Sequence, residues 1–216
     1  MAKMSELRKE MVDRQLAARG IQDPGVLRAM GEVPREAFVP KHLRHMAYAD
    51  SPLPIGEEQT ISQPYIVALM TEAMEVSAED RVLEIGTGSG YAAAVLSRIA
   101  AQVYTVERHG SLAKAARRRF EKVGYDNIHV RHGDGTLGWS AHAPYDAIVV
   151  TAGGPQVPEP LLEQLAIGGC LVIPVGPSHY SQELIRIRRT SEIDYRRENL
   201  GAVRFVPLVG SEGWEA

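Results

Sequence analysis

The sequence predicts an α/β fold: a doubly wound, mostly parallel sheet that follows a helical N-terminal extension and ends in a C-terminal antiparallel strand pair. Three observations support this prediction. From residue 81 onward, short β-rich runs alternate with helical segments, which is the pattern of βαβ units. Some runs are continuously apolar, such as Ile148-Val149-Val150, as expected for parallel strands buried on both faces. The first 80 residues instead have helical periodicity interrupted by prolines.

The first 80 residues are expected to form three helices and one irregular stretch. We expect the helices at residues 5–19, from residue 24 and after Ser62 with Pro64 in its first turn, and the irregular stretch at residues 33–56. Asp23 before Pro24 is typical of a helix start, because the aspartate can cap the first turn and the proline needs no donor there. In the third helix, apolar residues recur from Val67 at helical spacing, so one face is expected to be buried.

The rest of the chain is expected to alternate strands with helices. We expect strands at residues 81–85, 102–106, 128–131, 146–151 and 170–175, helices at 91–100, 111–123 and 160–167, and a final antiparallel pair at 182–189 and 203–208. Gly124 is placed to end the second of these helices, and Gly168-Gly169 to end the third. Sheets of this kind bind ligands at the carboxyl ends of their strands.

Composition excludes several classes of function. Lys and Arg number 24 against 27 Asp and Glu, and a net charge of −3 provides no basic surface for nucleic acid or an anionic membrane. The single cysteine excludes an internal disulfide and a Cys-based zinc cluster, and the seven histidines lack metal-ligand spacing, so we expect no metal site. Neither a signal-peptide core nor a membrane-length apolar stretch is present, so we expect a cytoplasmic protein.

A glycine-rich loop follows the first strand predicted after residue 80. Gly86, Gly88 and Gly90 lie between strand and helix, and glycines let the backbone approach a ligand closely. In the dinucleotide-binding pattern G-x-G-x-x-G the third glycine comes one position later, where this chain has Tyr91. Glu84 can hydrogen-bond an ammonium group and would repel a pyrophosphate. The loop therefore favours an amino-acid-like ligand over NAD or a plain turn.

Two further acidic residues are expected at neighbouring strand ends. Glu107 lies 21 residues after Gly86, a spacing that suits binding of ribose hydroxyls, with a solvated strand-end charge as the alternative. Asp134, between two glycines, suits hydrogen bonding to an adenine amino group and equally suits an Asx turn. With Glu84, these carboxylates favour a nucleoside that has a positively charged amino-acid arm. S-adenosylmethionine is such a ligand.

Several stretches of the chain match the motifs of one enzyme family. They are MVDRQLAARGIQDPGVLRAMGEVPREAFVP from residue 11, GEEQTISQPYIVALM from 56, VLEIGTGSGYAAAVL from 82, GDGTLG from 133, APYDAIVVTAGG from 143 and RFVPLVG from 204. The chain thereby resembles the protein-L-isoaspartate O-methyltransferase family. The resemblance implies a Rossmann-like methyltransferase sheet and methyl transfer from S-adenosylmethionine to the free carboxylate of L-isoaspartyl residues in damaged proteins and peptides. S-adenosylhomocysteine is the implied product, and the methyl ester then cyclises to a succinimide.

The resemblance also implies roles for particular residues. Ser62 is the implied catalytic residue, with helix capping as its alternative role. The implied cofactor-binding residues are Ser62, Glu84, Gly86, Thr87, Gly88, Glu107, Asp134, Gly135 and Gln182. Tyr65 departs from the histidine that many relatives have at this position. Residues 39–56 are a candidate cover for the site.

The expected organisation is one methyltransferase domain over residues 1–216. Residues 1–80 would form the helical extension and substrate-side segment, and residues 81–216 the S-adenosylmethionine-binding core. We expect a monomer that acts on isoaspartyl proteins and peptides, with neither nucleic acid nor a membrane as partner. The alternatives are a small-molecule methyltransferase of the same fold, a nicotinamide dehydrogenase and a non-catalytic cofactor-binding module.

Overall fold

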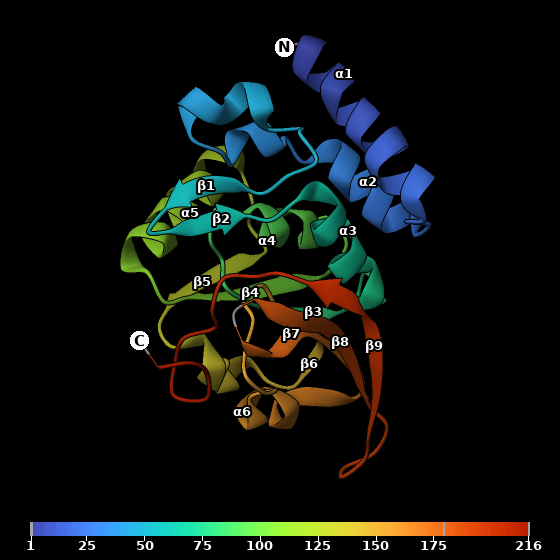
Figure 1. The fold of residues 1–216 in the computed structure, drawn as a ribbon, viewed down its shortest axis with the longest axis vertical. Helices are drawn as coiled ribbons and strands as arrows, with labels where there is room; N and C mark the ends of the chain where they lie inside the picture. The colour runs from blue at the N-terminus through green and yellow to red at the C-terminus, as the bar shows by residue number, and fades with distance from the viewer. Residues whose placement is uncertain (1, 179, 216) are drawn as a thin grey trace.

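A seven-stranded sheet forms the centre of the computed structural model, which describes residues 2–178 and 180–215 (Figure 1). Its strands are β3 (Arg81–Ile85), β4 (Gln102–Glu107), β5 (Ile128–His132), β6 (Tyr145–Val150), β7 (Leu165–Ser178), β8 (Ser181–Arg189) and β9 (Tyr195–Val203). The spatial order is β5-β4-β3-β6-β7-β8-β9, parallel from β5 to β7 and antiparallel from β7 to β9. The order reverses between β3 and β6, and a ligand crevice is expected at the carboxyl ends of these strands.

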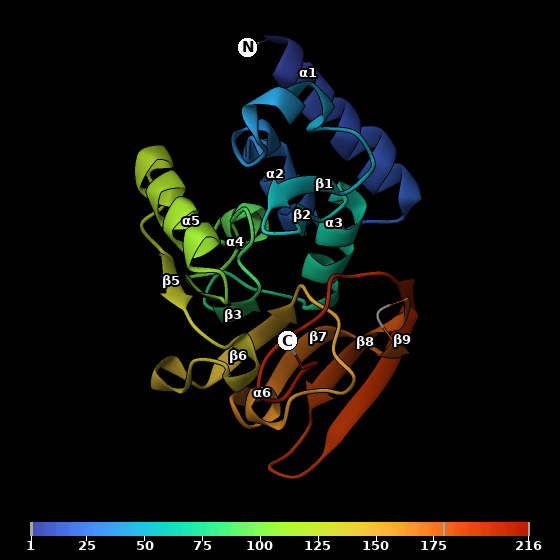
Figure 2. The same cartoon turned by 60° about the vertical axis from the view of Figure 1, so that its left-hand side comes forward.

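Helices cover both faces of the sheet, as Figure 2 shows. They are α1 (Ala2–Glu10), α2 (Pro24–Glu32), α3 (Pro64–Ala73), α4 (Tyr91–Leu96), α5 (Gly110–Val123) and α6 (Glu159–Glu163). A π-helical turn (Met11–Leu16) and a 3-10 turn (Ala17–Arg19) extend α1, and further 3-10 turns lie at Arg35–Ala37, Lys41–Met46, Gly135–Leu137 and Ser140–His142. A separate hairpin pairs β1 (Leu53–Gly56) with β2 (Gln59–Ile61). No helix among the described residues combines the length and apolar character that membrane crossing requires.

Alternate residues of β3 point into two different apolar layers. Val82 belongs to a cluster that joins the N-terminal helices to α4 and α5, whereas Leu83 and Ile85 belong to a cluster that includes α6. Because side chains alternate along a strand, Glu84 faces the same side as Val82. Glu84, two residues before the glycine loop, is therefore enclosed between the sheet and the N-terminal part of the chain.

The expected helix signals of the N-terminal part and of α5 are confirmed. Gly20 ends the first helix with φ +99°, and Gly124 ends α5 with φ +84°. The Asp23 carboxylate accepts a hydrogen bond of 2.7 Å from the Val26 N–H, so it caps α2. These signals depend only on residues close in sequence.

The prediction of a helix at residues 160–167 is wrong over its second half. α6 ends at Glu163, and β7 begins at Leu165 and continues through the two glycines. Gly168 has φ +86°, and a Cβ on Gly169 would lie 2.9 Å from the main-chain oxygen of Asp146 on β6. The glycines therefore allow an irregular register and a close approach of β6 and β7, and they do not end a helix.

The predicted strand at residues 203–208 is also wrong. The antiparallel partner of β8 is β9, an edge strand with mostly exposed polar side chains, so its sequence lacks the apolar alternation of a strand. Residues 204–208 instead cross the carboxyl end of the sheet. Val206 accepts a hydrogen bond from the Gly153 N–H, and Leu208 donates one to the Gly153 carbonyl, both 2.8 Å long.

Two smaller differences concern segment ends. The stretch expected to be irregular at residues 33–56 contains two 3-10 turns and ends in β1, because its last residues pair with β2. The helix expected at 91–100 ends at Leu96, beyond which hydrogen bonds over three residues, such as that from the Ile99 N–H to Leu96, are mixed with bonds over four.

Candidate active site

Two adjoining pockets lie at the carboxyl ends of β3, β4 and β6. The inner pocket is lined by residues that include Ser62, Met70, Glu84, Thr87 and Ser89, and the outer pocket by residues that include Glu107, His109, Gly135 and Leu208. Both are lined by Thr60, Gly86, Gly88 and Thr151. Because they share these four residues, an elongated small molecule could extend through both.

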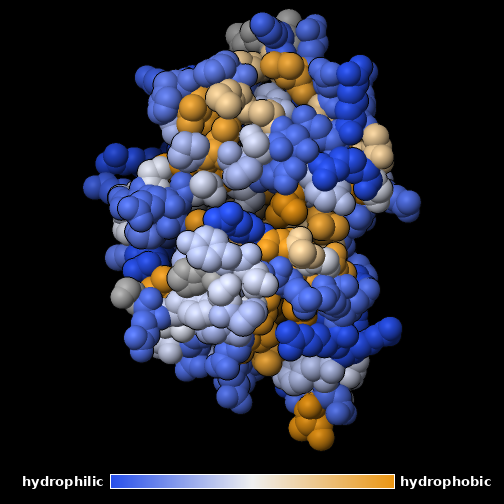
Figure 3. All heavy atoms as spheres, viewed as in Figure 1, coloured by the Kyte–Doolittle hydropathy of each residue, from blue (hydrophilic) through white to orange (hydrophobic). Residues whose placement is uncertain are grey.

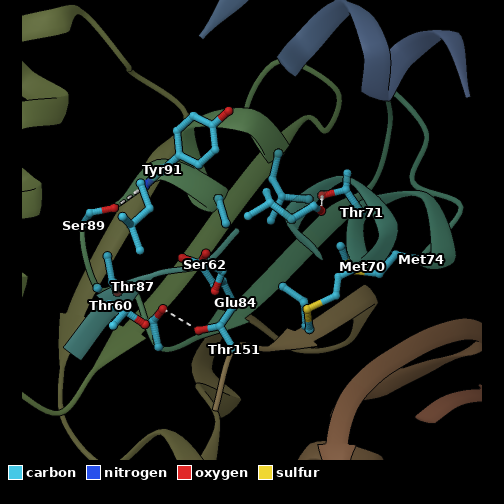
Figure 4. A pocket seen from close by; sticks show the side chains of 17 residues that line it. Thr60, Ser62, Met70, Thr71, Met74, Glu84, Thr87, Ser89, Tyr91 and Thr151 are labelled. Atoms are coloured by element: carbon cyan, nitrogen blue, oxygen red, sulfur yellow. Dashed lines mark hydrogen bonds between the residues drawn. The ribbon is translucent and has the colours of Figure 1, made fainter. Parts of the chain in front are cut away.

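The inner pocket is enclosed between the sheet and the N-terminal part of the chain. Figure 4 shows Ser62 and Glu84 near the middle of its lining, with Met70 of α3 and Met74, just after the end of α3, at one side. On the molecular surface, apolar residues gather at the boundary between the N-terminal helices and the C-terminal strands (Figure 3). The inner pocket therefore combines a few polar groups with an apolar wall.

The glycine loop has the conformation that its sequence predicts. Gly86, Gly88 and Gly90 all have positive φ, at +96°, +51° and +87°. A Cβ on Gly86 would lie 2.4 Å from the Thr151 hydroxyl, which donates a hydrogen bond of 2.8 Å to the Gly86 carbonyl. The absence of side chains thus lets β3 and β6 approach each other where the two pockets meet.

Glu84 is a fully buried carboxylic acid with one free oxygen. Its Oε2 accepts a hydrogen bond of 2.5 Å from Thr105, whose hydroxyl lies 2.6 Å from that of Thr87. Its Oε1 has no hydrogen-bond partner among the described residues. Burial raises the pKa of Glu84 to about 8, and the nearby charge of Glu107 adds to the rise, whereas the Thr105 hydroxyl and the main chain of Ala93 oppose it.

An ammonium group is the ligand that fits this arrangement. It would donate a hydrogen bond to the free Glu84 oxygen and stabilise the ionised carboxylate. No lysine or arginine lines the inner pocket, so no cationic side chain there could donate hydrogen bonds to a phosphate group. The residues present therefore fit the amino-acid arm of S-adenosylmethionine.

Glu107 lies at the end of β4, on the wall of the outer pocket. It is 5% exposed, and its two oxygens accept hydrogen bonds from the Gly88 N–H (2.7 Å) and the His109 N–H (2.9 Å). Because each carboxylate oxygen can accept a second hydrogen bond, this fixed group can still bind two ribose hydroxyls. The structure thus brings Glu107 to the same cavity as Glu84.

Asp134 is engaged in structural hydrogen bonds. One oxygen accepts from the N–H and hydroxyl of Thr136, and the other from the N–H and hydroxyl of Ser211. Burial tends to raise the pKa of Asp134, but these bonds outweigh it and hold the pKa below its ordinary value. Gly135 lines the outer pocket, whereas Asp134 does not. The Asx-turn alternative describes this geometry, and the adenine role stays a prediction.

Gln182 also lies outside the lining of both pockets. Its side-chain amide donates to the Phe205 carbonyl (3.2 Å) and accepts from the Phe205 N–H (2.8 Å). It therefore holds residues 204–208 across the sheet end, where Val206 and Leu208 line the outer pocket. The predicted contact of Gln182 with the cofactor stays a prediction.

Ser62 lines the inner pocket immediately before α3. The N-cap of α3 is Gln63, and no side-chain hydrogen bond caps this helix, so the structure does not support capping as the role of Ser62. No hydrogen bond of the Ser62 hydroxyl is found among the described residues, which leaves it available to a ligand. Tyr65 lies outside the lining, with the Arg19 guanidinium 3.7 Å from its ring centre.

The sequence of the chain matches the family described as protein-L-isoaspartate (D-aspartate) O-methyltransferase over residues 6–213. The chain belongs to this family. Protein-L-isoaspartate O-methyltransferase 2 of Pelobacter propionicus is 67% identical, with 97% of this chain and 93% of that protein covered. Protein-L-isoaspartate O-methyltransferase 1 of Geotalea uraniireducens is 63% identical, with 98% and 96% covered.

Solved structures of the protein-L-isoaspartate O-methyltransferase family have the same fold. One superposes with a TM-score of 0.85 at 32% identity, over 95% of this chain and 67% of that chain. A relative from Plasmodium falciparum, solved in complex with S-adenosyl-L-homocysteine, superposes with a TM-score of 0.81 at 26% identity, over 94% and 98%. These similarities confirm the fold class expected from the sequence.

Among the site residues that were not expected from the sequence, two threonines have a structural role. Thr105 holds Glu84, and Thr151 lies where the inner and outer pockets meet. A signal was available for both, because each is a threonine in or just after an otherwise apolar strand. Polar side chains in such places need a partner, and here the partners are the carboxylate and the glycine loop.

Proposed function

We infer that this chain transfers the methyl group of S-adenosylmethionine to the free carboxylate of L-isoaspartyl residues in damaged proteins and peptides. Its match to the protein-L-isoaspartate O-methyltransferase family over residues 6–213 is the observation that carries this inference. The geometry of the cavity supports the cofactor, since the free oxygen of Glu84 fits an ammonium group. S-adenosylhomocysteine and a methyl ester are the products, and the ester cyclises to a succinimide.

The cofactor would extend through both pockets. Its ammonium group would bind Glu84 in the inner pocket, and its ribose would bind Glu107 in the outer pocket. Between these two groups, the cofactor would lie against the main chain of the glycine loop at Gly86, Thr87 and Gly88. Gly135 and residues 206–208 would surround the base. A dinucleotide fits less well, because a phosphate group would oppose the ionisation of Glu84 and would meet no lysine or arginine in the lining of the inner pocket.

The reaction requires positioning more than acid–base catalysis. Bound S-adenosylmethionine supplies an electrophilic methyl group, which an ionised carboxylate accepts without a general base. The opposite charges of the reactants cancel in the transition state, so an enclosed site such as the inner pocket favours the reaction. In-line alignment of the reacting groups can contribute up to about 7–11 kcal/mol. The Ser62 hydroxyl would donate a hydrogen bond to one acceptor oxygen and thereby hold the other in line.

Ser62→Ala tests this role. Turnover of isoaspartyl peptide should fall at least about tenfold, which corresponds to about 1.4 kcal/mol of barrier. Affinity for S-adenosylhomocysteine and the melting temperature should change little, because the Ser62 hydroxyl caps no helix. Ser62→Thr is the matched control and should retain part of the activity. Wild-type turnover by folded Ser62→Ala would exclude Ser62 as the catalytic residue.

The substrate class has its own test. The wild-type protein should methylate an isoaspartyl peptide and leave the matching aspartyl peptide almost unmodified. The two peptides differ only in whether the main chain continues through the α-carboxyl or the side-chain carboxyl group, so the candidates for recognising the backbone are residues 39–56 and 203–208. Ile55 lies next to Gly88, and residues 206–208 line the outer pocket. Equal methylation of both would contradict the repair function but keep the methyltransferase activity. Cofactor binding without methylation of either would indicate a binding module or a small-molecule enzyme.

The remaining features of the proposal concern organisation. The chain would act as one methyltransferase domain, because a single apolar cluster joins helices before residue 80 to the sheet after it. It would act as a monomer in the cytoplasm, on protein and peptide substrates. Size-exclusion chromatography with light scattering would test the monomer.

A further inference from the structure

Arg35 is a buried cation without a carboxylate partner. Its side chain is 0% exposed, and it forms no ion pair with a described carboxylate. Its Nε donates to the Ala47 carbonyl (2.8 Å) and one terminal nitrogen donates to the Ser62 carbonyl (2.7 Å). The other terminal nitrogen has no hydrogen-bond acceptor among the described residues, and the guanidinium carbon lies 4.8 Å from the Tyr91 ring centre.

The hydrogen bond from Arg35 supplies a donor to the Ser62 carbonyl, which has none from a strand or a helix. β2 ends at Ile61, and the first carbonyl of α3 to accept a helical hydrogen bond is that of Gln63. The Ser62 carbonyl lies between the two, where neither the strand ladder nor the helix supplies a donor. Arg35 supplies one, and so it fixes the peptide group from which the Ser62 side chain projects into the inner pocket.

Arg35 also places a positive charge next to Ser62. A guanidinium stays protonated even when buried, and in a protein interior its field is screened less than in water. Arg35 does not line either pocket, so it lies behind the Ser62 main chain. The inner pocket therefore has an acid, Glu84, in its wall and a positive charge beside Ser62. The first suits an ammonium group and the second a carboxylate.

We propose that Arg35 is a positioning residue for the acceptor carboxylate, which it serves by fixing the Ser62 main chain and by placing an unpaired positive charge beside it. This proposal rests on the methyl-transfer function proposed above. The two contributions predict different effects. The charge attracts the carboxylate on binding and so lowers KM. The hydrogen bonds to the Ala47 and Ser62 carbonyls hold the main chain that carries the Ser62 hydroxyl, and so raise kcat.

Two substitutions separate these contributions. Arg35→Met removes the charge and the hydrogen bonds, and it should raise KM for an isoaspartyl peptide at least tenfold and lower kcat. Arg35→Lys replaces the guanidinium, which bonds the two carbonyls from different nitrogens, by a single nitrogen. Because burial lowers the pKa of a lysine, this variant is assayed from about pH 8 down to about pH 6. Where the lysine is charged, KM should stay within about threefold of wild type while kcat falls at least tenfold. Calorimetry should give an S-adenosylhomocysteine affinity within about twofold of wild type for both variants.

Arg119 offers a matched control on the cofactor side. It donates a hydrogen bond to the Ser89 carbonyl of the glycine loop, and its guanidinium carbon lies 5.6 Å from the Phe38 ring centre. Arg119→Met should therefore weaken S-adenosylhomocysteine binding and leave the peptide KM at saturating cofactor near wild type. This is the reverse of the pattern expected for Arg35→Met.

The outcomes distinguish a positioning role from a purely structural one. If Arg35 only stabilised the fold, both variants would lose activity in proportion to their folded fraction, with KM unchanged, and that result would overturn the proposal. If Arg35→Met does not fold, an unchanged kcat in Arg35→Lys would overturn it equally. No methylation of isoaspartyl peptide by the wild type would overturn the proposed function as well, whereas unchanged kinetics in active variants would overturn this proposal alone.

Discussion

Glu84→Gln replaces a buried acid by a neutral side chain of nearly the same shape. Burial raises the pKa of Glu84 to about 8, against an ordinary value of 4.5. At 1.36 kcal/mol per pH unit, this difference corresponds to roughly 5 kcal/mol. The unfolded chain loses the proton near pH 4.5 and the folded chain near pH 8, so the stability of the cofactor-free protein should fall across this range. Glu84→Gln should lack this fall, and its melting temperature should exceed that of wild type by more at pH 8 than at pH 5.

Cofactor binding should remove the proton from Glu84. At pH 7, about nine-tenths of a group with a pKa of 8 is protonated, and an incoming ammonium group requires the ionised form. Binding of S-adenosylhomocysteine should therefore release close to one proton, and affinity should increase about tenfold per pH unit up to about pH 7 and less steeply above it. Glu84→Gln should bind more weakly and release no proton.

Titration calorimetry at pH 7 in buffers of different ionisation enthalpy measures this release. Thr105→Val is the matched control, since it removes the hydrogen bond to Glu84 but keeps the carboxylate, and it should still release a proton. Binding to wild type without proton release, or equal release by Glu84→Gln, would refute the assignment of the ammonium group to Glu84.

Three further predictions follow from the same site. Glu107→Ala should weaken S-adenosylhomocysteine binding by about 1.5–3 kcal/mol for each lost ribose bond, and unchanged affinity in calorimetry would remove Glu107 from the cofactor site. Asp134→Asn should lower the melting temperature with little effect on cofactor affinity, because the carboxylate accepts bonds from Ser211. Burial acts to raise the pKa of Asp134, but its hydrogen bonds hold the pKa below the ordinary 3.8. The ionised carboxylate should therefore stabilise the folded protein at neutral pH, and thermal unfolding should show that this contribution is lost in acid. A loss of affinity at normal stability would instead support the adenine role. Gly86→Ala should lower both stability and cofactor affinity, since φ is +96° and the new Cβ would lie 2.4 Å from the Thr151 hydroxyl; a normal melting temperature would contradict this.

The sequence by itself determined the parts of the protein that depend on neighbouring residues. β3 covers the predicted residues 81–85, and the glycine loop has the positive φ angles that its glycines allow. Glu84 and Glu107 were placed at strand ends from their spacing to these glycines, and both line the cavity. A continuous apolar run sufficed to predict β6, because a strand buried on both faces needs no polar alternation.

Only the tertiary structure decided which distant segments meet at the site. β9 is an exposed edge strand, and its polar sequence has no local signal, so its pairing with β8 depends on the fold. Gln182 binds a residue 23 positions away, Asp134 one 77 positions away, and Arg35 binds Ser62 across 27 positions. Each of these polar side chains could equally have been solvated or bound to a ligand. Their partners were settled by burial of the whole chain, because a buried polar group is stable only where the folded chain supplies its hydrogen bonds.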